Sequence, residues 1–145
     1  HLTYMDKITS RGITNNYKKL MTNILAIDYG SKNIGLAGKI GDDNPIVPYD
    51  ILANDQNTFI NLDKIINEKN INFILIGMPY CLSGKSGPQA EIVQKFAQNI
   101  EDKFNLEIEF IDERLTSKLF DDQMPNSDSM VAYHLLDSYL KRSKK

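Results

Sequence analysis

Three acidic residues from distant parts of the chain could together hold a divalent metal ion. Asp28 directly follows an apolar run, Glu113 follows a second run, and Asp128 stands where a third hydrophobic pattern begins. Magnesium and manganese prefer carboxylate oxygen, and a hard cation that keeps several waters needs few protein ligands. Two such ions roughly 3.5–4 Å apart can supply the nucleophilic water and relieve charge on the leaving oxygen in phosphodiester hydrolysis.

Each of these acids also has a purely structural interpretation. Asp28 could begin a polar turn, although an acid directly after four buried apolar residues usually has a partner. Glu113 could pair with Arg114 on the surface, and an Asp at a helix start is usually an N-cap. The residues alone therefore favour function for Asp28 and capping for Asp128, and capping does not exclude metal binding.

The elements that must position these acids alternate between strands and helices. Apolar runs bounded by turn residues predict strands at Asn23–Asp28, Ile34–Ile40, Ile46–Ala53, Phe73–Gly77 and Leu106–Asp112. Helical spacing of apolar residues predicts helices at Thr58–Lys69, from Pro88 to Phe104, and from Ser127 or Asp128 onward. Pro48 interrupts the third strand and assigns it to a sheet edge.

Strands separated by helices are expected to be parallel, with right-handed connections. Their carboxyl ends, at Asp28, Gly77 and Asp112-Glu113, then lie on one edge of the sheet. The last helix could present Asp128 at the same edge.

In the helix from Pro88, the expected buried stripe is Ile92, Val93, Phe96, Ile100 and Phe104.

The turn after Asp28 could contact a phosphate. Gly30 and Gly35 bracket it and would let backbone amides approach an anion, although hairpin glycines are more often only turn residues. Lys32 lies within the turn and offers a cation. The complete set of expected substrate contacts is Gly30, Lys32, Gly77, Pro79, Lys85 and Arg114.

Composition bounds these hypotheses. The chain has 145 residues, of which 41% are hydrophobic and 25% charged, as expected for one α/β domain. No apolar run approaches the roughly 18 residues of a membrane span, and a single cysteine fits a reducing cytosol, so a cytoplasmic protein is expected. A net charge of −2 counts mildly against nucleic-acid binding, unless bound cations offset it locally.

The hydrophobic pattern begins clearly only after Met21. Residues 1–20 are therefore interpreted as an N-terminal extension or a remnant of expression, and residues 21–145 as the domain.

Four motifs follow one another along the chain. The first is Ile27 to Ala37, and the second comprises Gly77-Met78-Pro79 with Gly84 through Ala97. The third is Asp112 to Ser117, and the fourth runs from Asp128-Ser129 to Leu140. Together they resemble the bacterial YqgF/RuvX family of Holliday junction resolvases, which are also implicated in maturing the 5′ end of pre-16S ribosomal RNA, and the third motif is the most diagnostic. The resemblance covers roughly Met21 to Leu140, and four motifs in order are more specific than any one of them.

The resemblance implies an RNase H-like α/β fold, with a five-stranded mixed sheet of order 3-2-1-4-5 and helices on both faces. It also implies that Asp28, Glu113 and Asp128 are catalytic acids that bind Mg²⁺ or Mn²⁺, which raises Asp128 from a cap to a ligand. Two departures stand out: Asn33 replaces the usual Arg, and segment 118–127 is short and lacks the usual connector's basic residues. Both could change substrate affinity or choice.

The expected function is a metal-dependent endonuclease that processes the 5′ end of pre-16S rRNA during ribosome biogenesis. A DNA junction resolvase is the alternative within enzymes, and because symmetric resolution needs two active sites it would require a homodimer. A non-catalytic RNA-binding assembly factor is the alternative from another class. Actin-like and sugar-kinase folds also use an Asp-x-Gly turn, but they need a longer chain with a second domain.

Overall fold

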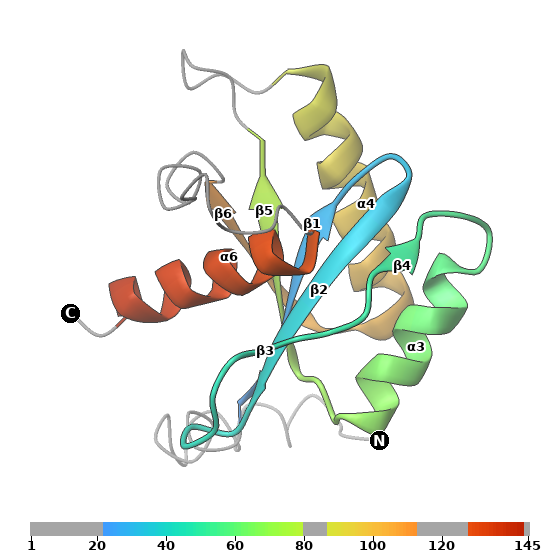
Figure 1. The fold of residues 1–145 in the computed structure, drawn as a ribbon. Coiled ribbons are helices and arrows are strands. Elements are labelled where there is room, and N and C mark those ends of the chain that lie inside the picture. The colour runs from blue at the N-terminus through green and yellow to red at the C-terminus, as the bar shows by residue number, and fades with distance from the viewer. Residues whose placement is uncertain (1–21, 80–86, 113–127, 144–145) are drawn as a thin grey trace, which may run out of the picture.

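A computed structural model describes residues 22–79, 87–112 and 128–143. They form one mixed sheet with helices on both sides (Figure 1). The strands are β1 (Asn23–Tyr29), β2 (Asn33–Ile40), β3 (Val47–Pro48), β4 (Leu52–Ala53), β5 (Phe73–Met78) and β6 (Glu107–Asp112). The helices are α3 (Thr58–Glu68), α4 (Pro88–Phe104) and α6 (Asp128–Ser143).

The sheet has the order β3-β2-β1-β5-β6, with β4 also paired to β2. Strand β1 is central: it pairs antiparallel with β2 and parallel with β5, and β5 pairs parallel with β6. Residues Ile24 to Ile27 are all buried, as expected for a strand covered on both faces. The parallel strands therefore end at one common edge of the sheet.

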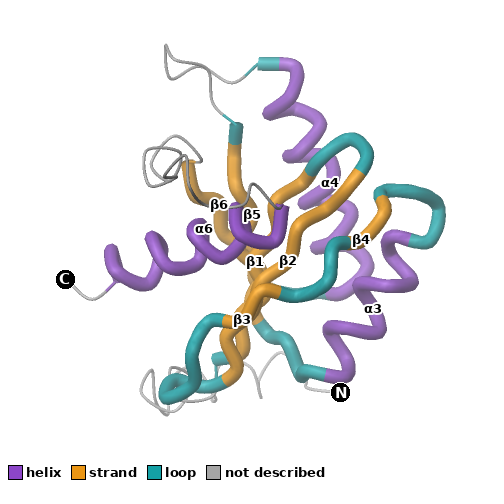
Figure 2. Tube along the Cα trace, in the orientation of Figure 1, coloured by secondary structure: helices purple, strands orange, loops and turns teal. Residues whose placement is uncertain are grey.

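Helices α3 and α4 cover one side of this sheet, and α6 covers the other (Figures 1 and 2). Side chains alternate between the two sides along each strand. In β1, Leu25 and Ile27 belong to the core under α3 and α4, whereas Ile24 and Ala26 belong to the core under α6. This alternation fixes which side each residue near the sheet edge faces.

Local sequence accounts for the helix boundaries. Pro88 occupies the first turn of α4, where its missing N–H has no helical partner to lose. Asn105 ends α4 in the left-handed conformation, with φ of 54°, and its N–H donates to the Glu101 carbonyl. Asn70, with φ of 52°, turns the chain from α3 toward β5 in the same conformation.

One expected strand, Ile46–Ala53, is wrong as a single element. The structure has two short strands instead, β3 opposite Ala37 and Gly38, and β4 opposite Asn33 and Ile34. Pro48 has no N–H to donate, and after it the Tyr49 N–H donates to the Leu36 carbonyl of β2 before β4 pairs with the same strand. The expected α/β fold class is confirmed, but the sheet has six strands instead of five. Its order is β3-β2-β1-β5-β6 instead of 3-2-1-4-5, because the extra strand shifts the numbers of the last two.

The expected buried stripe of α4 is wrong at Ile92, which is 49% exposed. Val93, Phe96 and Ile100 are buried as expected, and Ala90 and Ala97 complete the buried face. At about 100° per residue, the buried face of α4 is centred near Val93 and Ile100, and Ile92 lies roughly 100° around the helix from that direction, outside the buried face.

No helix within the described part of the chain is long and apolar enough to cross a membrane.

Candidate active site

Asp28 lies at the carboxyl end of the central strand, on the side that α6 covers. It continues the alternation of Ile24 and Ala26, which pack under α6. The register pairs Ile27 with Ile76, so Asp28 stands one residue further, beside Gly77 of β5. The side chain is half-buried. The structure thus places this expected acid at the sheet edge where the parallel strands end.

Glycines flank Asp28 on both neighbouring strands. Gly35 of β2 is its direct antiparallel partner, and Gly77 of β5 stands beside it on the other side. Neither neighbour carries a side chain that would cover the carboxylate from within the sheet. A glycine inside a strand often marks a place where a ligand or another backbone approaches closely. The two glycines therefore keep the side chains of the neighbouring strands away from the Asp28 carboxylate.

The turn between β1 and β2 is held by Asn54. Its side-chain amide donates to the Gly30 carbonyl at 2.8 Å, and its backbone N–H donates to the Lys32 carbonyl at 2.9 Å. A methyl group on Gly30 would come within 2.5 Å of the Asn33 carbonyl oxygen. Lys32 itself is exposed, as a phosphate contact must be. Sequence reasoning missed Asn54, because an Asn in a polar segment between a strand and a helix gives no signal of such a role.

The carboxyl ends of β5 and β6 lie next to this turn in the sheet. Asp112 ends β6 opposite Met78, and Pro79 follows β5 as a half-buried residue. Ile111, aligned with Gly77, packs under α6. Of the other expected site residues, Lys85, Glu113 and Arg114 lie outside the described residues, as do residues 1–20.

Helix α6 runs across the side of the sheet that Asp28 faces. Its later part is fixed to β5 and β6: the Tyr139 ring lies 5.8 Å from that of Phe73, and the Tyr139 hydroxyl donates to the Glu109 carboxylate at 2.7 Å. Asp128 is the first residue of the helix, roughly 16 Å from Tyr139 at about 1.5 Å per residue. The helix therefore begins toward β1 and β2, as Figure 1 shows.

Among the described residues, no three His, Cys, Asp or Glu side chains are close enough to hold a metal ion. The expected set depends on Glu113 and on the side chain of Asp128, both outside the described part. The fit to a metal ion therefore rests on Asp28: a half-buried carboxylate at a strand end, with glycines on both sides. Hard divalent cations bind such oxygen donors.

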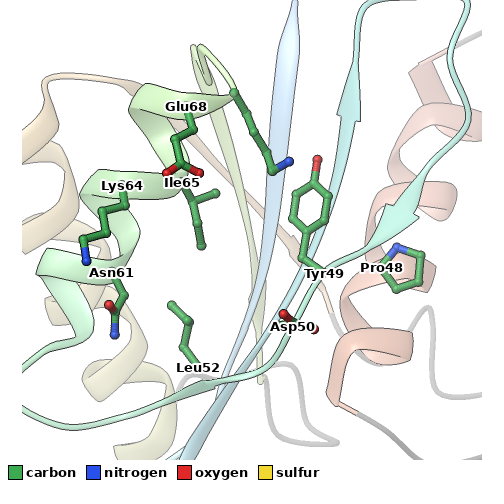
Figure 3. A pocket seen from close by; sticks show the side chains of 9 residues that line it. Pro48, Tyr49, Asp50, Leu52, Asn61, Lys64, Ile65 and Glu68 are labelled. Carbon is green, nitrogen blue, oxygen red and sulfur yellow. The ribbon is translucent and has the colours of Figure 1, made fainter.

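A hollow of about 480 Å³ lies away from this edge, between α3 and the segment from Pro48 to Leu52 (Figure 3). The Tyr49 ring covers Gly38 of β2, and the Lys69 ammonium lies 4.6 Å from the centre of that ring. Lys64 and Glu68 face the hollow from α3, opposite Asp50. Its charges are mixed in sign, so the hollow has no clear preference for a phosphate backbone.

Residues 22–142 match the model of the RuvX family, which is described as Holliday junction resolvase. The chain belongs to the RuvX family. The resemblance seen in the four motifs is confirmed, and with it the expected class of enzyme, because resolvases hydrolyse phosphodiester bonds. Two curated proteins named "Putative pre-16S rRNA nuclease" are each 32% identical to it. One from Sulfurihydrogenibium sp. is matched over 84% of this chain and 92% of its own length, and one from Rickettsia felis over 89% and 94%.

Solved structures resemble the RuvX chain in fold. Thermus thermophilus RuvC in complex with a Holliday junction substrate aligns with a TM-score of 0.54 and 9% identity, over 84% of this chain and 96% of that one. Fowlpox virus resolvase in complex with Holliday junction DNA also aligns with a TM-score of 0.54, at 15% identity, over 86% and 100%. At such low identity these neighbours establish the resolvase-like, RNase H-type fold alone.

Proposed function

We propose that this protein is a metal-dependent endonuclease that processes the 5′ end of pre-16S rRNA during ribosome biogenesis in the cytoplasm. The observation that carries the proposal is the position of Asp28. It ends the central strand with glycines on both sides, on the sheet side that α6 covers, in a chain of the RuvX family. The names of the relatives support RNA as the substrate.

Asp28, Glu113 and Asp128 are the proposed ligands of Mg²⁺ or Mn²⁺. When bound, the metal would activate water and stabilise charge on the leaving oxygen. Three acids, from the first described strand, the chain after β6 and the start of α6, would hold the metal where it can contact the scissile phosphate. This assignment is supported by the side of the sheet that Asp28 faces and by the direction of α6.

The remaining expected contacts would bind the nucleic-acid backbone. Lys32 is exposed on the β1–β2 turn, and Gly30 lets the backbone of that turn fold closely over Asn33. Gly77 and Pro79 would form the wall beside Asp28, and Lys85 and Arg114 would supply further cations. Because the net charge is −2, these few cations and the bound metal must attract the phosphates locally.

A DNA junction resolvase is the second candidate. The family description and the two junction-bound structures of similar fold favour it. Resolution of a four-way junction by paired cuts needs two active sites, so this function would require a homodimer. A non-catalytic RNA-binding assembly factor is the third candidate, and it would need neither metal nor Asp28.

A cleavage assay separates the three candidates. The protein is incubated with a labelled pre-16S RNA fragment or a four-way DNA junction, each with Mn²⁺, Mg²⁺ or EDTA. The test variant is Glu113→Gln, and the matched control is Glu101→Gln, an equal loss of charge at an exposed position of α4. Metal-dependent cutting of the RNA alone, lost only in Glu113→Gln, is the expected result.

The other outcomes each point elsewhere. Cutting of the junction alone, by a dimer, would establish the resolvase instead. Tight RNA binding with no cutting in any metal would favour the assembly factor. We also propose that residues 21–145 are the folded domain, so removal of residues 1–20 should leave the thermal unfolding midpoint and the cleavage rate unchanged.

A further inference from the structure

A second hollow, of about 230 Å³, lies beside the proposed active site on the opposite side of the sheet. It is bounded by the end of β1, the start of α3 and the middle of α4. Its lining includes Tyr29, Phe59, Ile92, Lys95, Phe96 and Asn99, together with one acid, Asp55, just before α3. We call it the Tyr29 hollow.

Three aromatic rings form one side of the Tyr29 hollow. The centres of the Tyr29 and Phe96 rings are 4.5 Å apart, and those of Phe59 and Phe96 are 5.8 Å apart. Phe96 is buried, whereas Tyr29 and Phe59 are only half-buried and keep part of their surface open. The rings thus fix one another in place and still offer aromatic surface to a ligand.

Helix α4 supplies the other side with three residues at helical spacing. Ile92, Lys95 and Asn99 are exposed and lie on the same face, so they border the hollow together. Ile92 does not pack into the core from α4, although its side chain is large and apolar. The face combines apolar surface, a cation and an amide beside the aromatic rings.

The Tyr29 hollow lies close enough to Asp28 to contact the same strand of nucleic acid. Tyr29 is the residue directly after Asp28, so their Cα atoms are about 3.8 Å apart. Their side chains point to opposite sides of the strand, Asp28 toward α6 and Tyr29 toward α3 and α4. A strand of nucleic acid that passes over the end of β1 with its phosphate at Asp28 would reach the Tyr29 hollow with a neighbouring nucleotide.

We propose that the Tyr29 hollow holds one unpaired base of the nucleic-acid strand that is cut at Asp28. This inference rests on the proposed nuclease function and adds that the substrate is single-stranded next to the scissile bond. The base stacks on the open surface of Tyr29 and Phe59, as bases do in proteins that bind single strands. Lys95 contacts a flanking phosphate, and the Asn99 amide hydrogen-bonds to the edge of the base.

Size and chemistry favour a single base over other occupants. The volume of about 230 Å³ lies below the roughly 300–1,000 Å³ of pockets for drug-sized ligands, and it suits an occupant with a single ring system. Bases inside a duplex are stacked on each other and cannot enter. RNA and DNA bases have the same stacking faces, so the hollow itself does not select between them.

Photochemical crosslinking tests the placement directly. An RNA with a single-stranded segment carries 5-iodouridine at successive positions around the cleavage site, and it is bound to Asp28→Asn so that the RNA stays intact. Mass spectrometry of the crosslinked protein should identify Tyr29 or Phe59 at one nucleotide position. Crosslinks that map only to other residues, from every position, would overturn the proposal.

Affinity measurements separate stacking from a merely structural role. In Phe59→Leu the ring is lost while apolar volume is kept. Unpaired RNA should bind this variant about fivefold to a hundredfold more weakly, the range typical of one stacked base. Replacing the proposed base by an abasic site should weaken the unaltered protein by a similar factor and Phe59→Leu hardly at all. Equal effects of the abasic site on both proteins would contradict stacking.

A charge reversal on α4 tests the phosphate contact. Lys95→Glu should weaken binding of unpaired RNA about fivefold or more, whereas Lys64→Glu, an equal change at an exposed site on α3, should alter it less than twofold. Cleavage with no crosslink at the hollow would disprove this inference and leave the nuclease standing. A crosslink without any metal-dependent cleavage would disprove the nuclease and leave the base site.

Discussion

Asp28 stands directly opposite Gly35 in the antiparallel pair of β1 and β2. Gly35 is buried, so a side chain added there would lie inside the protein rather than at its surface. The Cβ atoms of directly opposite residues in such a pair lie about 4.5–5.5 Å apart. Any side chain at position 35 would therefore stand next to the Asp28 carboxylate and compete with whatever it binds.

The substitution Gly35→Ala should reduce cleavage more than it reduces folding. The added methyl group narrows the space beside Asp28, so we expect metal affinity to fall about tenfold or more, a loss typical of changes next to metal ligands. The free energy of unfolding should fall by about 1–3 kcal/mol from overpacking. Titration of Mn²⁺ against the cleavage rate, with urea unfolding as the control, measures both. Unchanged metal dependence would show that this space is not used.

The substitution Asp28→Asn should abolish metal-dependent cleavage. The amide keeps the shape of the side chain but removes the charge that a hard cation requires. Since loss of a residue that merely supports a metal ligand already costs about 10–100-fold, a loss above a hundredfold is expected here. Cleavage is measured at saturating Mn²⁺, and thermal unfolding without metal should match that of the unaltered protein. Full activity in this variant would remove Asp28 from the mechanism.

The substitution Gly30→Ala should distort the β1–β2 turn. Its methyl carbon would meet the Asn33 carbonyl oxygen at 2.5 Å, too close for the turn to stay as it is. We expect a loss of about 1–3 kcal/mol in the free energy of unfolding and weaker RNA binding through Lys32. Ser31→Ala, in the same turn but exposed, should change neither quantity. If Gly30→Ala, like Ser31→Ala, changes neither the free energy of unfolding nor RNA binding, the turn relieves the close contact at Gly30 without a cost in stability.

The phenol of Tyr49 should make the protein less stable at alkaline pH. Burial raises the pKa of Tyr49 above its ordinary value of 10.0. A group whose pKa is higher in the folded state stabilises fully below its unfolded pKa, and this contribution is lost as the pH rises through the folded pKa. Between about pH 9 and about pH 11, Tyr49→Phe should therefore lose less stability than the unaltered protein in urea unfolding. Parallel losses in the two proteins would contradict the burial effect.

The sequence predicted those elements whose signals come from burial. The runs at Asn23–Asp28 and Phe73–Gly77 are apolar because both faces of these strands are covered. This constraint can be read directly from the amino-acid sequence. The segment from Ile46 to Ala53 carries no such constraint, since it lies at the sheet edge and pairs only in short stretches. The segment divides into β3 and β4 because of the path it takes along β2. Local propensity does not encode that path.

The sequence predicts the candidate site only where a site residue lies at the end of a buried strand. Asp28 stands out because an acid follows a buried run, and parallel connections place it near Gly77 and the end of β6. That Asp28 lies opposite Gly35 follows from the register of the β1–β2 pair, and that Asn54 holds the β1–β2 turn follows from the tertiary fold. Neither can be read from the local sequence. The expected burial of Ile92 is wrong because the spacing of apolar residues does not show how far the buried face extends around α4.

Helix α6 is the only described helix over its side of the sheet, and it is the last described element in the chain. A ribosome delivers β1, β5 and β6 long before it delivers residues 128–143. During that interval Ile24, Ala26, Leu75 and Ile111 have no helix over them, and exposed apolar surface of this kind promotes aggregation of nascent chains. The proposed acid at position 128 is missing from the site for the same interval. Until α6 packs on the sheet, the growing polypeptide is therefore most prone to aggregation, and it lacks one of the three proposed metal ligands.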